Sequence, residues 1–418
     1  MKACSLFVAS LLTALLTVPA GAAKKPAAAA APVRVDIALR HALQGPAREA
    51  LIRLAARFND AQQGRASVRL EDLAGVADRR HLPQLALLDA DDGVAYFDTL
   101  PRYKPLYKLM AETREKFEPR QFLPLLVEAV DDPAGRLQAL PLGLALPVLF
   151  WNKEAYARAG LDPERAPQTW QQLQNDAGKL FDAGSRCPYT TSRFTWVHLE
   201  NLSAQNGEPV SVRDARGVMR VVLNRMVDVK HVSLLASWQK SRYFHYFGRA
   251  DEADRKFLAG ECAILSGASS LATTAKAASF PVGMAALPRY DDVYGATPDR
   301  LLPDGLALWL LAGNKKAEDL VAARFISFLL APASQREWLQ GTGFLPMTAY
   351  ALDTVPVSRE VRQMLTRASN TARGKHGYGL ARQREILAEE IETVWRDGRA
   401  PMEALNAAVG RINAGDKP

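Results

Sequence analysis

The stretch from Pro141 to Leu173 limits the fold most, because it changes from one kind of element to another within a few residues. A short apolar run from Leu144 to Trp151 predicts a buried strand. Asn152 can cap the helix that follows, and Gly160 can end that helix. Thr169 can cap a second helix in turn. A buried strand that leads into a new helical layer in mid-chain indicates a passage between two lobes.

The size of the chain agrees with two lobes. It has 418 residues and 48% hydrophobic content, which is enough for two sizeable cores and too long for one ordinary domain. The net charge of +8 is spread along the chain, so it indicates a generally basic soluble surface rather than nucleic-acid binding. Zinc-like Cys/His spacing, a P-loop and a dinucleotide glycine fingerprint are all missing, so no cofactor or metal is predicted.

The first residues have the composition of an export signal. Residues 1–23 combine Lys2, an apolar run from Leu6 to Val18 and small residues before the predicted cleavage point. Cys4 precedes the apolar run, so it is placed too early to carry a lipid at that point. Residues 24–32 are rich in Lys, Pro and Ala and are expected to form a disordered leader. We therefore expect a soluble periplasmic protein without a lipid anchor.

Two cysteines remain after that processing, Cys187 and Cys262. In an oxidising compartment they can pair, and as buried free thiols they can equally be ordinary core residues. The sequence gives no Cα separation, so both alternatives stay open.

The stretch from Pro141 to Leu173 contains three short motifs: Phe150-Trp151-Asn152-Lys153, Ala159-Gly160-Leu161 and Pro167-Gln168-Thr169-Trp170. They resemble the signature of the extracellular solute-binding proteins of bacterial ABC importers, the group that includes the maltose-binding protein. The resemblance implies a two-lobe α/β periplasmic-binding-protein fold, with hinge strands that cross between the lobes and a cleft between them. The alternative is an ordinary strand–helix pair of an α/β domain.

A second group of residues narrows the resemblance to one subfamily. Trp196 is followed by Leu199-Glu200-Asn201, as in the glycerol-3-phosphate-binding proteins of periplasmic uptake systems, and Arg193 replaces a first Trp of that subfamily. The similarity covers residues 33–412. An indole offers a flat apolar face and one donor to a polyol, so Trp196 is either a ligand contact or a core anchor.

The resemblance implies boundaries for the two lobes. The N-terminal lobe is expected to comprise residues 33–143 and 304–348, and the C-terminal lobe residues 144–303 and 349–412. Loops at the carboxyl ends of strands in an open α/β sheet are where ligands bind, so we expect ligand contacts there.

In the N-terminal lobe the candidate ligand-binding residues are His41, Asp98, Gly305 and Phe344. Residues 73–88 are expected to be helical and residues 93–98 to form a strand that ends in Asp98. An ionised carboxylate there can accept several ligand hydroxyl groups, although it can also be a helix cap. Gly305 matches a family glycine where backbone must approach closely.

In the C-terminal lobe the candidates are Ser269, Ser270, Arg193 and His376, beside Trp196. The two serines precede a helix and can form an anion cradle or a simple cap. Where the subfamily has a pair of phosphate-binding serines, this chain has Gly-Leu-Ala-Leu-Pro at residues 143–147. Arg193 can compensate with a bidentate phosphate contact, or the site has lost phosphate.

The sequence thus predicts a monomeric binding protein without a catalytic site, which closes around glycerol 3-phosphate or a glycerophosphodiester and delivers it to a membrane permease. An uncharged sugar or polyol is the alternative ligand. A secreted hydrolase is an alternative of another class, although the chain lacks Gly-x-Ser-x-Gly and His-Glu-x-x-His motifs. A sensor on the same fold also stays open.

Overall fold

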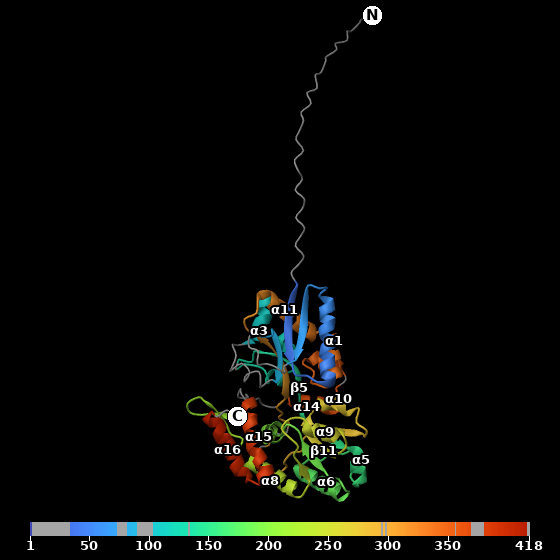
Figure 1. The fold of residues 1–418 in the computed structure, drawn as a ribbon, viewed down its shortest axis with the longest axis vertical. Coiled ribbons are helices and arrows are strands. Elements are labelled where there is room, and N and C mark those ends of the chain that lie inside the picture. Colours follow the sequence, from blue (N-terminus) through green and yellow to red (C-terminus); the bar gives the residue numbers. More distant parts are fainter. Residues whose placement is uncertain are drawn as a thin grey trace. The chain divides into compact units, whose positions relative to one another are not determined.

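The structure, a computed structural model, describes Met1 and residues 34–72, 82–89, 103–132, 134–293, 296, 299–355, 357–368 and 380–415. Apart from Met1, the predicted signal peptide and leader lie outside these ranges, as do Asp98, the strand predicted over residues 93–98, and His376. Within these ranges the chain builds two α/β lobes, each around its own sheet (Figure 1). The predicted fold class is therefore confirmed.

The first sheet has six strands in the described residues, and its order places β13 between strands from the first 145 residues of the chain. The path β2-β1-β3-β13-β4 is joined by β5, which also pairs with β13. Strands β1, β2 and β3 are parallel, and β13 runs antiparallel to its partners. The bounds are β1 Val35–His41, β2 Ala66–Asp72, β3 Leu85–Asp89, β4 Tyr103–Lys104, β5 Leu140–Ala145 and β13 Asp304–Leu311.

Helices from both ends of the lobe's sequence pack on this sheet and on each other, α1 against β2 and α11 against β1. The bounds are α1 Gly45–Ala61, α3 Leu106–Thr113, the 3-10 helix η1 Pro119–Gln121, α4 Pro124–Val127, α11 Lys316–Leu330, α12 Pro332–Thr342 and α13 Ala349–Thr354.

The second sheet, as far as the described residues show it, has five strands in the order β10-β7-β11-β6-β12. Strands β10, β7 and β11 are parallel, and β6 runs antiparallel to β11 and β12. A separate hairpin is formed by β8 and β9. The bounds are β6 Pro147–Asn152, β7 Tyr189–Thr191, β8 Ser211–Arg213, β9 Met219–Val221, β10 Phe244–His245, β11 Ile264–Ala268 and β12 Val282–Ala286.

The remaining helices include the C-terminal pair α15 and α16, which pack against α8. One of these helices, η2, is a π-helix. The bounds are α5 Lys153–Arg158, α6 Trp170–Asp182, η2 Trp196–Glu200, α7 Asn201–Gln205, α8 Met226–Lys240, α9 Glu252–Leu258, α10 Leu271–Ala275, α14 Arg359–Ala368, α15 Leu380–Asp397 and α16 Pro401–Ala414.

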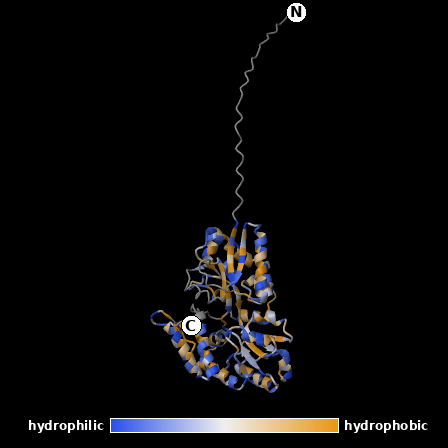
Figure 2. Cartoon of the chain, in the orientation of Figure 1, coloured by the Kyte–Doolittle hydropathy of each residue, from blue (hydrophilic) through white to orange (hydrophobic). Residues whose placement is uncertain are grey.

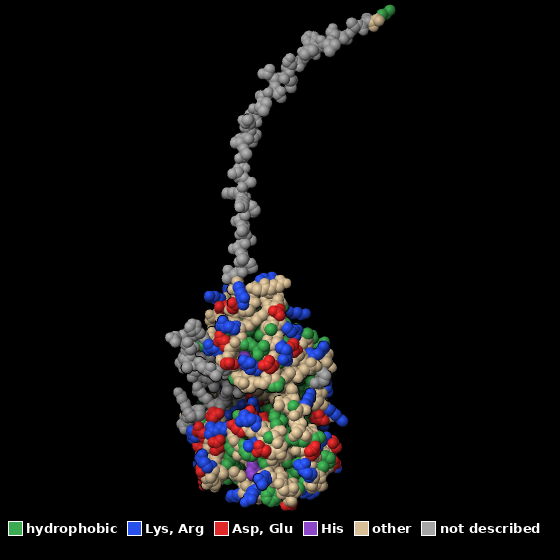
Figure 3. Space-filling view, turned by 45° about the vertical axis from the view of Figure 1, so that its right-hand side comes forward, with side chains coloured by type: hydrophobic (Ala, Val, Ile, Leu, Met, Phe, Trp, Pro, Cys, Tyr) green, Lys and Arg blue, Asp and Glu red, His purple; other side chains and the backbone are tan. Residues whose placement is uncertain are grey.

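Two large clusters of buried apolar side chains support the two sheets. The first spans the first sheet and continues along the crossing strand to Phe150, and the second includes Trp170, Tyr189 and Trp238. Hydrophobic and hydrophilic residues alternate along the helices of both lobes (Figure 2). Side chains of both charge signs are interspersed over the face in Figure 3.

The helix caps expected between Pro141 and Leu173 are confirmed. The Asn152 side chain accepts a hydrogen bond from the Ala155 amide at 3.0 Å, and Thr169 accepts one from the Gln172 amide at 3.1 Å. Gly160 has a φ of 68°, the left-handed conformation that ends the helix. These local signals needed only neighbouring residues.

The single strand predicted over residues 144–151 is wrong in one respect, because it is two strands. Strand β5 ends at Ala145 in the first sheet, and β6 begins at Pro147 in the second. Leu146 lies between them, and its amide and carbonyl both bond to Ser269. Proline has no amide hydrogen to donate to a ladder, so a strand boundary at this point is physically reasonable. Leu146 is therefore the crossing point.

The helix predicted over residues 73–88 is also wrong at its end. Residues 85–89 form β3, a central strand of the first sheet, and its residues Leu85 to Leu88 are almost fully buried. A strand covered on both faces is apolar throughout, so the sequence lacks the alternation that separates strand from helix. Two described strands of this sheet end in an acid, β2 in Asp72 and β3 in Asp89.

Cys187 and Cys262 form a disulfide, which settles the alternative that the sequence left open. The two residues are 75 positions apart, and they lie just before β7 and β11, which are neighbours in the second sheet. A bridge that closes a loop of this length restricts the unfolded chain and is worth about 4 kcal/mol in the chain-entropy account.

Candidate functional site

A cavity of about 190 Å³ lies beside the start of η2 and is the centre of the candidate site. It is enclosed by residues from η2, from α15 and from the start of β13, so segments far apart in sequence meet there. Two predicted site residues line it, Arg193 and Trp196. The other lining residues are Phe194, Thr195, Tyr246, Arg249, Ala250, Asp304, Arg384, Glu385, Ala388 and Ile391.

Trp196 forms part of the wall but does not offer its donor to the cavity. Its side chain is almost fully buried, and the indole Nε1 donates to the carbonyl oxygen of Leu302 at 2.8 Å. Asn201 fixes the same segment, because its side chain bonds to both the carbonyl and the amide of Leu302. Only the apolar ring of Trp196 can therefore contact a guest in this conformation.

Arg384, on α15, joins two carboxylates that come from separate parts of the chain. Its Nε and Nη2 atoms donate to the two oxygens of Glu200 at 2.6 and 2.7 Å. Its Nη1 atom donates to Oδ2 of Asp304 at 2.8 Å. Glu200 and Asp304 are buried, and the bidentate geometry is the strong form of an arginine–carboxylate contact. This cluster ties η2 and α15 to the first residue of β13.

Arg193 differs from the other two arginines of the cavity. Arg249 donates to Glu392 and Glu385, and Arg384 donates to Glu200 and Asp304. The nearest carboxylate oxygen to Arg193 Nη1, by contrast, is 3.9 Å away, on Asp304. Its side chain is 40% exposed. Arg193 also has a φ of 49°, a left-handed conformation that costs a non-glycine residue free energy and often marks a functional position.

Gly305 follows Asp304 directly and needs to be glycine. Its φ is 137°, and a Cβ atom there would lie 2.3 Å from the carbonyl oxygen of Gly143. Gly143 is constrained in turn, since its own Cβ would lie 2.9 Å from Leu306 and 3.2 Å from the ring of Phe344. The expected close backbone approach at Gly305 is therefore present, between the two crossing strands.

Ser269, Ser270 and Phe344 lie around the same crossing point. The Ser269 hydroxyl accepts from the Leu146 amide at 3.0 Å, so this serine holds the crossing strand. Ser270 precedes the short helix α10, and its side chain makes no cap hydrogen bond. Phe344 stacks on Trp338 with ring centroids 5.8 Å apart. A Cβ atom on Gly343 would lie 2.6 Å from the Ser270 carbonyl oxygen, so these loops touch.

His41 is the last residue of β1. Its side chain is almost fully buried, and Nδ1 has no hydrogen-bond partner among the described residues. Burial lowers the pKa of His41, partly opposed by Asp72, so the ring is neutral at pH 7. A neutral imidazole can still donate or accept one hydrogen bond at the end of the strand.

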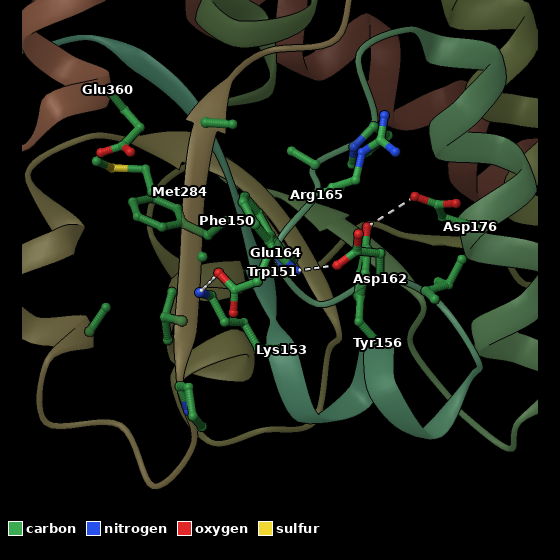
Figure 4. Close-up of a pocket in the computed structure, with 18 of the residues that line it drawn as sticks. Phe150, Trp151, Lys153, Tyr156, Asp162, Glu164, Arg165, Asp176, Met284 and Glu360 are labelled. Atoms are coloured by element: carbon green, nitrogen blue, oxygen red, sulfur yellow. Dashed lines mark hydrogen bonds and ion pairs between the residues drawn. The ribbon is translucent and has the colours of Figure 1, made fainter.

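A larger hollow of about 970 Å³ lies along β12, and none of the predicted site residues lines it (Figure 4). Two pairs of its polar side chains bond to each other: Lys153 donates to Glu164 at 2.5 Å, and Tyr156 donates to Asp176 at 3.3 Å. Trp151 and Tyr156 line it but are almost fully buried, so they expose little aromatic surface to a ligand. The smaller cavity is therefore the better candidate.

The structure thus gathers six of the nine predicted residues near the crossing strands: Arg193, Trp196, Ser269, Ser270, Gly305 and Phe344. No described contact joins His41 to them, and Asp98 and His376 lie outside the described residues. Sequence reasoning missed Asp304 and Arg384, which are 80 positions apart. The only local signal was Asp304, a lone acid at the start of an apolar strand.

The described residues contain no helix that is both long and apolar enough to cross a membrane. They also contain no group of three or more His, Cys, Asp or Glu side chains placed to hold a metal ion.

Comparison with known proteins decides the family. Residues 77–364 match the family described as bacterial extracellular solute-binding protein, which is more than half of the chain. The chain belongs to this family. The resemblance seen in the sequence motifs is therefore confirmed.

Two relatives have names that state their ligand. The chain is 32% identical over 410 residues to the sn-glycerol-3-phosphate-binding periplasmic protein UgpB of Pectobacterium atrosepticum, covering 92% of each chain. It is 33% identical over 402 residues to UgpB of Salmonella typhimurium, covering 89% of this chain and 90% of the relative.

Solved solute-binding proteins share the fold at lower identity. UgpB from Mycobacterium tuberculosis, solved in complex with glycerophosphocholine, has a TM-score of 0.71 at 20% identity, covering 91% of this chain and 98% of the other. The GacH receptor of Streptomyces glaucescens, solved unliganded and with acarbose, has a TM-score of 0.74 at 16% identity, covering 92% and 100%.

Proposed function

We propose that this solute-binding protein is the periplasmic substrate-binding component of an ABC importer for glycerol 3-phosphate or a glycerophosphodiester. The names of the relatives and the glycerophosphocholine complex of a structural neighbour support this ligand class. The protein binds and releases its ligand and makes or breaks no bond in it.

The observation that carries the proposal is the guanidinium of Arg193. It lines the cavity beside the Trp196 ring, it is partly exposed, and its nearest carboxylate oxygen is beyond hydrogen-bond distance at 3.9 Å. A planar guanidinium matches the oxygens of a phosphate bidentately, and the ring of Trp196 can pack on the glycerol carbons. Arg193 thus supplies a charge that replaces the phosphate-binding serines of the subfamily.

Ligand capture is proposed to close two rigid bodies about the crossing strands. One body comprises residues 33–143 and 304–348, and the other residues 144–303 and 349–412. Asp98, His41, Gly305 and Phe344 are the contacts proposed for the first body, and Ser269, Ser270, Trp196 and His376 for the second. Closure follows only from the better affinity of the ligand for the closed form. The closed monomer is then recognised by an inner-membrane permease.

An uncharged sugar or polyol is the second candidate, because one observation favours it. Leu144 and Leu146 occupy the stretch where the subfamily has serines, and both side chains are fully buried and apolar. The nearby Ser269 hydroxyl is engaged with the Leu146 amide. If Arg193 does not bind phosphate, the stretch from Leu144 to Leu146 offers a ligand no charged group in its place.

Isothermal calorimetry with glycerol 3-phosphate, glycerophosphocholine and maltose tests the proposal, on the wild type and on Arg193→Gln. We expect the wild type to bind a phosphate compound and Arg193→Gln to bind it at least tenfold more weakly, since a hydrogen bond to a charged group contributes about 1.5–3 kcal/mol. Binding of maltose alone would refute the phosphate ligand and support the sugar.

Arg242→Gln is the matched control. Arg242 is also an exposed arginine with a left-handed backbone, at φ 62°, but it does not line the cavity. Arg242→Gln removes the same charge from the molecule and should leave every affinity unchanged. An equal loss in both variants would show that net charge, rather than contact, binds the ligand.

A further inference from the structure

Asp304 lies between two arginines that can both reach the same oxygen atom. Nη1 of Arg384 donates to Asp304 Oδ2 at 2.8 Å, while Nη1 of Arg193 stands 3.9 Å from that oxygen. The Asp304 side chain is only 6% exposed, so water screens its charge poorly. The two guanidinium groups therefore compete for one carboxylate, and Arg384 holds it.

Asp304 and Arg384 are each held in place by further contacts. Asp304 is the first residue of β13, and its backbone is in register with Ala145 on β5. Arg384 is fixed by its two hydrogen bonds to Glu200, at 2.6 and 2.7 Å. The carboxylate of Asp304 is thus held away from Arg193 by the strand pairing on one side and by α15 on the other.

We propose that Asp304 and Arg384 set the preference of the site for anionic ligands, without touching the ligand themselves. This inference rests on the proposed function, in which Arg193 binds the ligand phosphate. Arg384 keeps the Asp304 carboxylate beyond hydrogen-bond distance of Arg193, and so it leaves that guanidinium available to an anion. The two are positioning residues that determine specificity.

The charges of the cluster predict whether the removal of each residue weakens or strengthens anion binding. Glu200 and Asp304 together carry two negative charges, Arg384 balances one of them, and Arg193 balances the other at longer range. Without Arg384, both carboxylates would attract Arg193 and repel an incoming phosphate. Without the charge on Asp304, Arg193 would have less competition. The two removals should therefore act in opposite directions on anion affinity.

Calorimetry with glycerol 3-phosphate on Arg384→Gln, Asp304→Asn and the double variant tests this inference. We expect Arg384→Gln to weaken binding at least tenfold and Asp304→Asn to bind within threefold of the wild type or more tightly. The double variant should recover at least half of the logarithmic loss. If Asp304→Asn also weakens binding by more than threefold, the pair only supports the fold and the inference is overturned.

A crystal structure of unliganded Arg384→Gln gives a readout that needs no ligand. We expect the Arg193–Asp304 distance to shorten from 3.9 Å to hydrogen-bond distance. An unchanged or longer distance would overturn the restraining role of Arg384. If this variant does not fold because Glu200 is left buried without a partner, the affinity of Asp304→Asn alone decides.

These readouts keep the two proposals distinguishable. A wild type that binds no phosphate compound contradicts the proposed function, and the Arg193–Asp304 distance in Arg384→Gln still decides whether Arg384 restrains Asp304. If the wild type binds a phosphate compound and Arg384→Gln binds it with the same affinity, this inference is contradicted and the proposed function still stands.

Discussion

At the scale of single residues, two glycines separate the effect of backbone strain from that of close approach. Gly305 and Gly313 both have positive φ, at 137° and 96°, but a Cβ atom on Gly313 would meet nothing within 4 Å. We expect Gly313→Ala to lower the free energy of unfolding by about 1 kcal/mol, through strain alone. Gly305→Ala should lose about 3 kcal/mol or more, since the new Cβ also collides with the Gly143 backbone. Urea unfolding of the two variants measures the difference, and equal losses would contradict the role of the contact.

At the scale of elements, η2 is tied to α8 by a pair of buried histidines. Nδ1 of His198 and Nε2 of His231 lie 2.8 Å apart, and Nδ1 of His231 lies 2.9 Å from the Tyr290 hydroxyl. The chain of hydrogen bonds continues from His198 to Ser266 at 3.2 Å. Burial lowers the pKa of His198 and lowers that of His231 from 6.5 to about 3. Both rings are therefore held neutral, and they fix the helix that carries Trp196.

This histidine pair predicts a loss of stability in acid. Below pH 6.5 the His231 ring of the unfolded chain takes up a proton, whereas in the folded protein it stays neutral until about pH 3. The free energy of unfolding therefore falls as pH falls through that window. From this residue alone we expect a loss of about 2 kcal/mol between pH 7 and pH 5. His231→Gln should be less stable than the wild type at pH 7 but should lose less on acidification. Urea unfolding at both pH values checks this, and equal losses in the two proteins would contradict it.

At the scale of the whole molecule, the net charge of +8 bears on how an anionic ligand arrives. Charges of both signs are interspersed over the face in Figure 3, so we attribute the attraction to the net charge, which acts at long range and is screened by salt. We expect the association rate constant for glycerol 3-phosphate to fall several-fold when salt rises from about 0.02 to 0.3 M, since the Debye length shrinks over that range. Stopped-flow fluorescence measures it. A change confined to the dissociation rate constant would show that the field of the whole protein plays no part.

Much of the fold was predictable because its signals are local. Asn152 and Thr169 cap their helices with side chains that reach only three residues along the chain. The apolar runs and the left-handed Gly160 are likewise properties of neighbouring residues. The exception is β3. It is buried on both faces and apolar throughout, so it lacks the alternation of apolar and polar residues that would distinguish a strand from a helix.

The candidate site was only partly predictable, since its geometry depends on distant partners. The sequence indicated Arg193 and Trp196, but it could not show that the Trp196 indole nitrogen is bound to Leu302, 106 positions away. Nor could it pair Arg384 with Glu200 across 184 positions. Patterns of neighbouring residues do not record which segments meet after the chain has crossed between sheets.

By itself, then, the sequence determined the classes of element, their caps and the crossing of the chain between two lobes, because these follow from short-range backbone and burial preferences. Only the tertiary structure decided that Cys187 bonds to Cys262, and that Arg384 rather than Arg193 holds Asp304. The reason is physical: such pairings depend on distances between atoms that the chain brings together only when it folds.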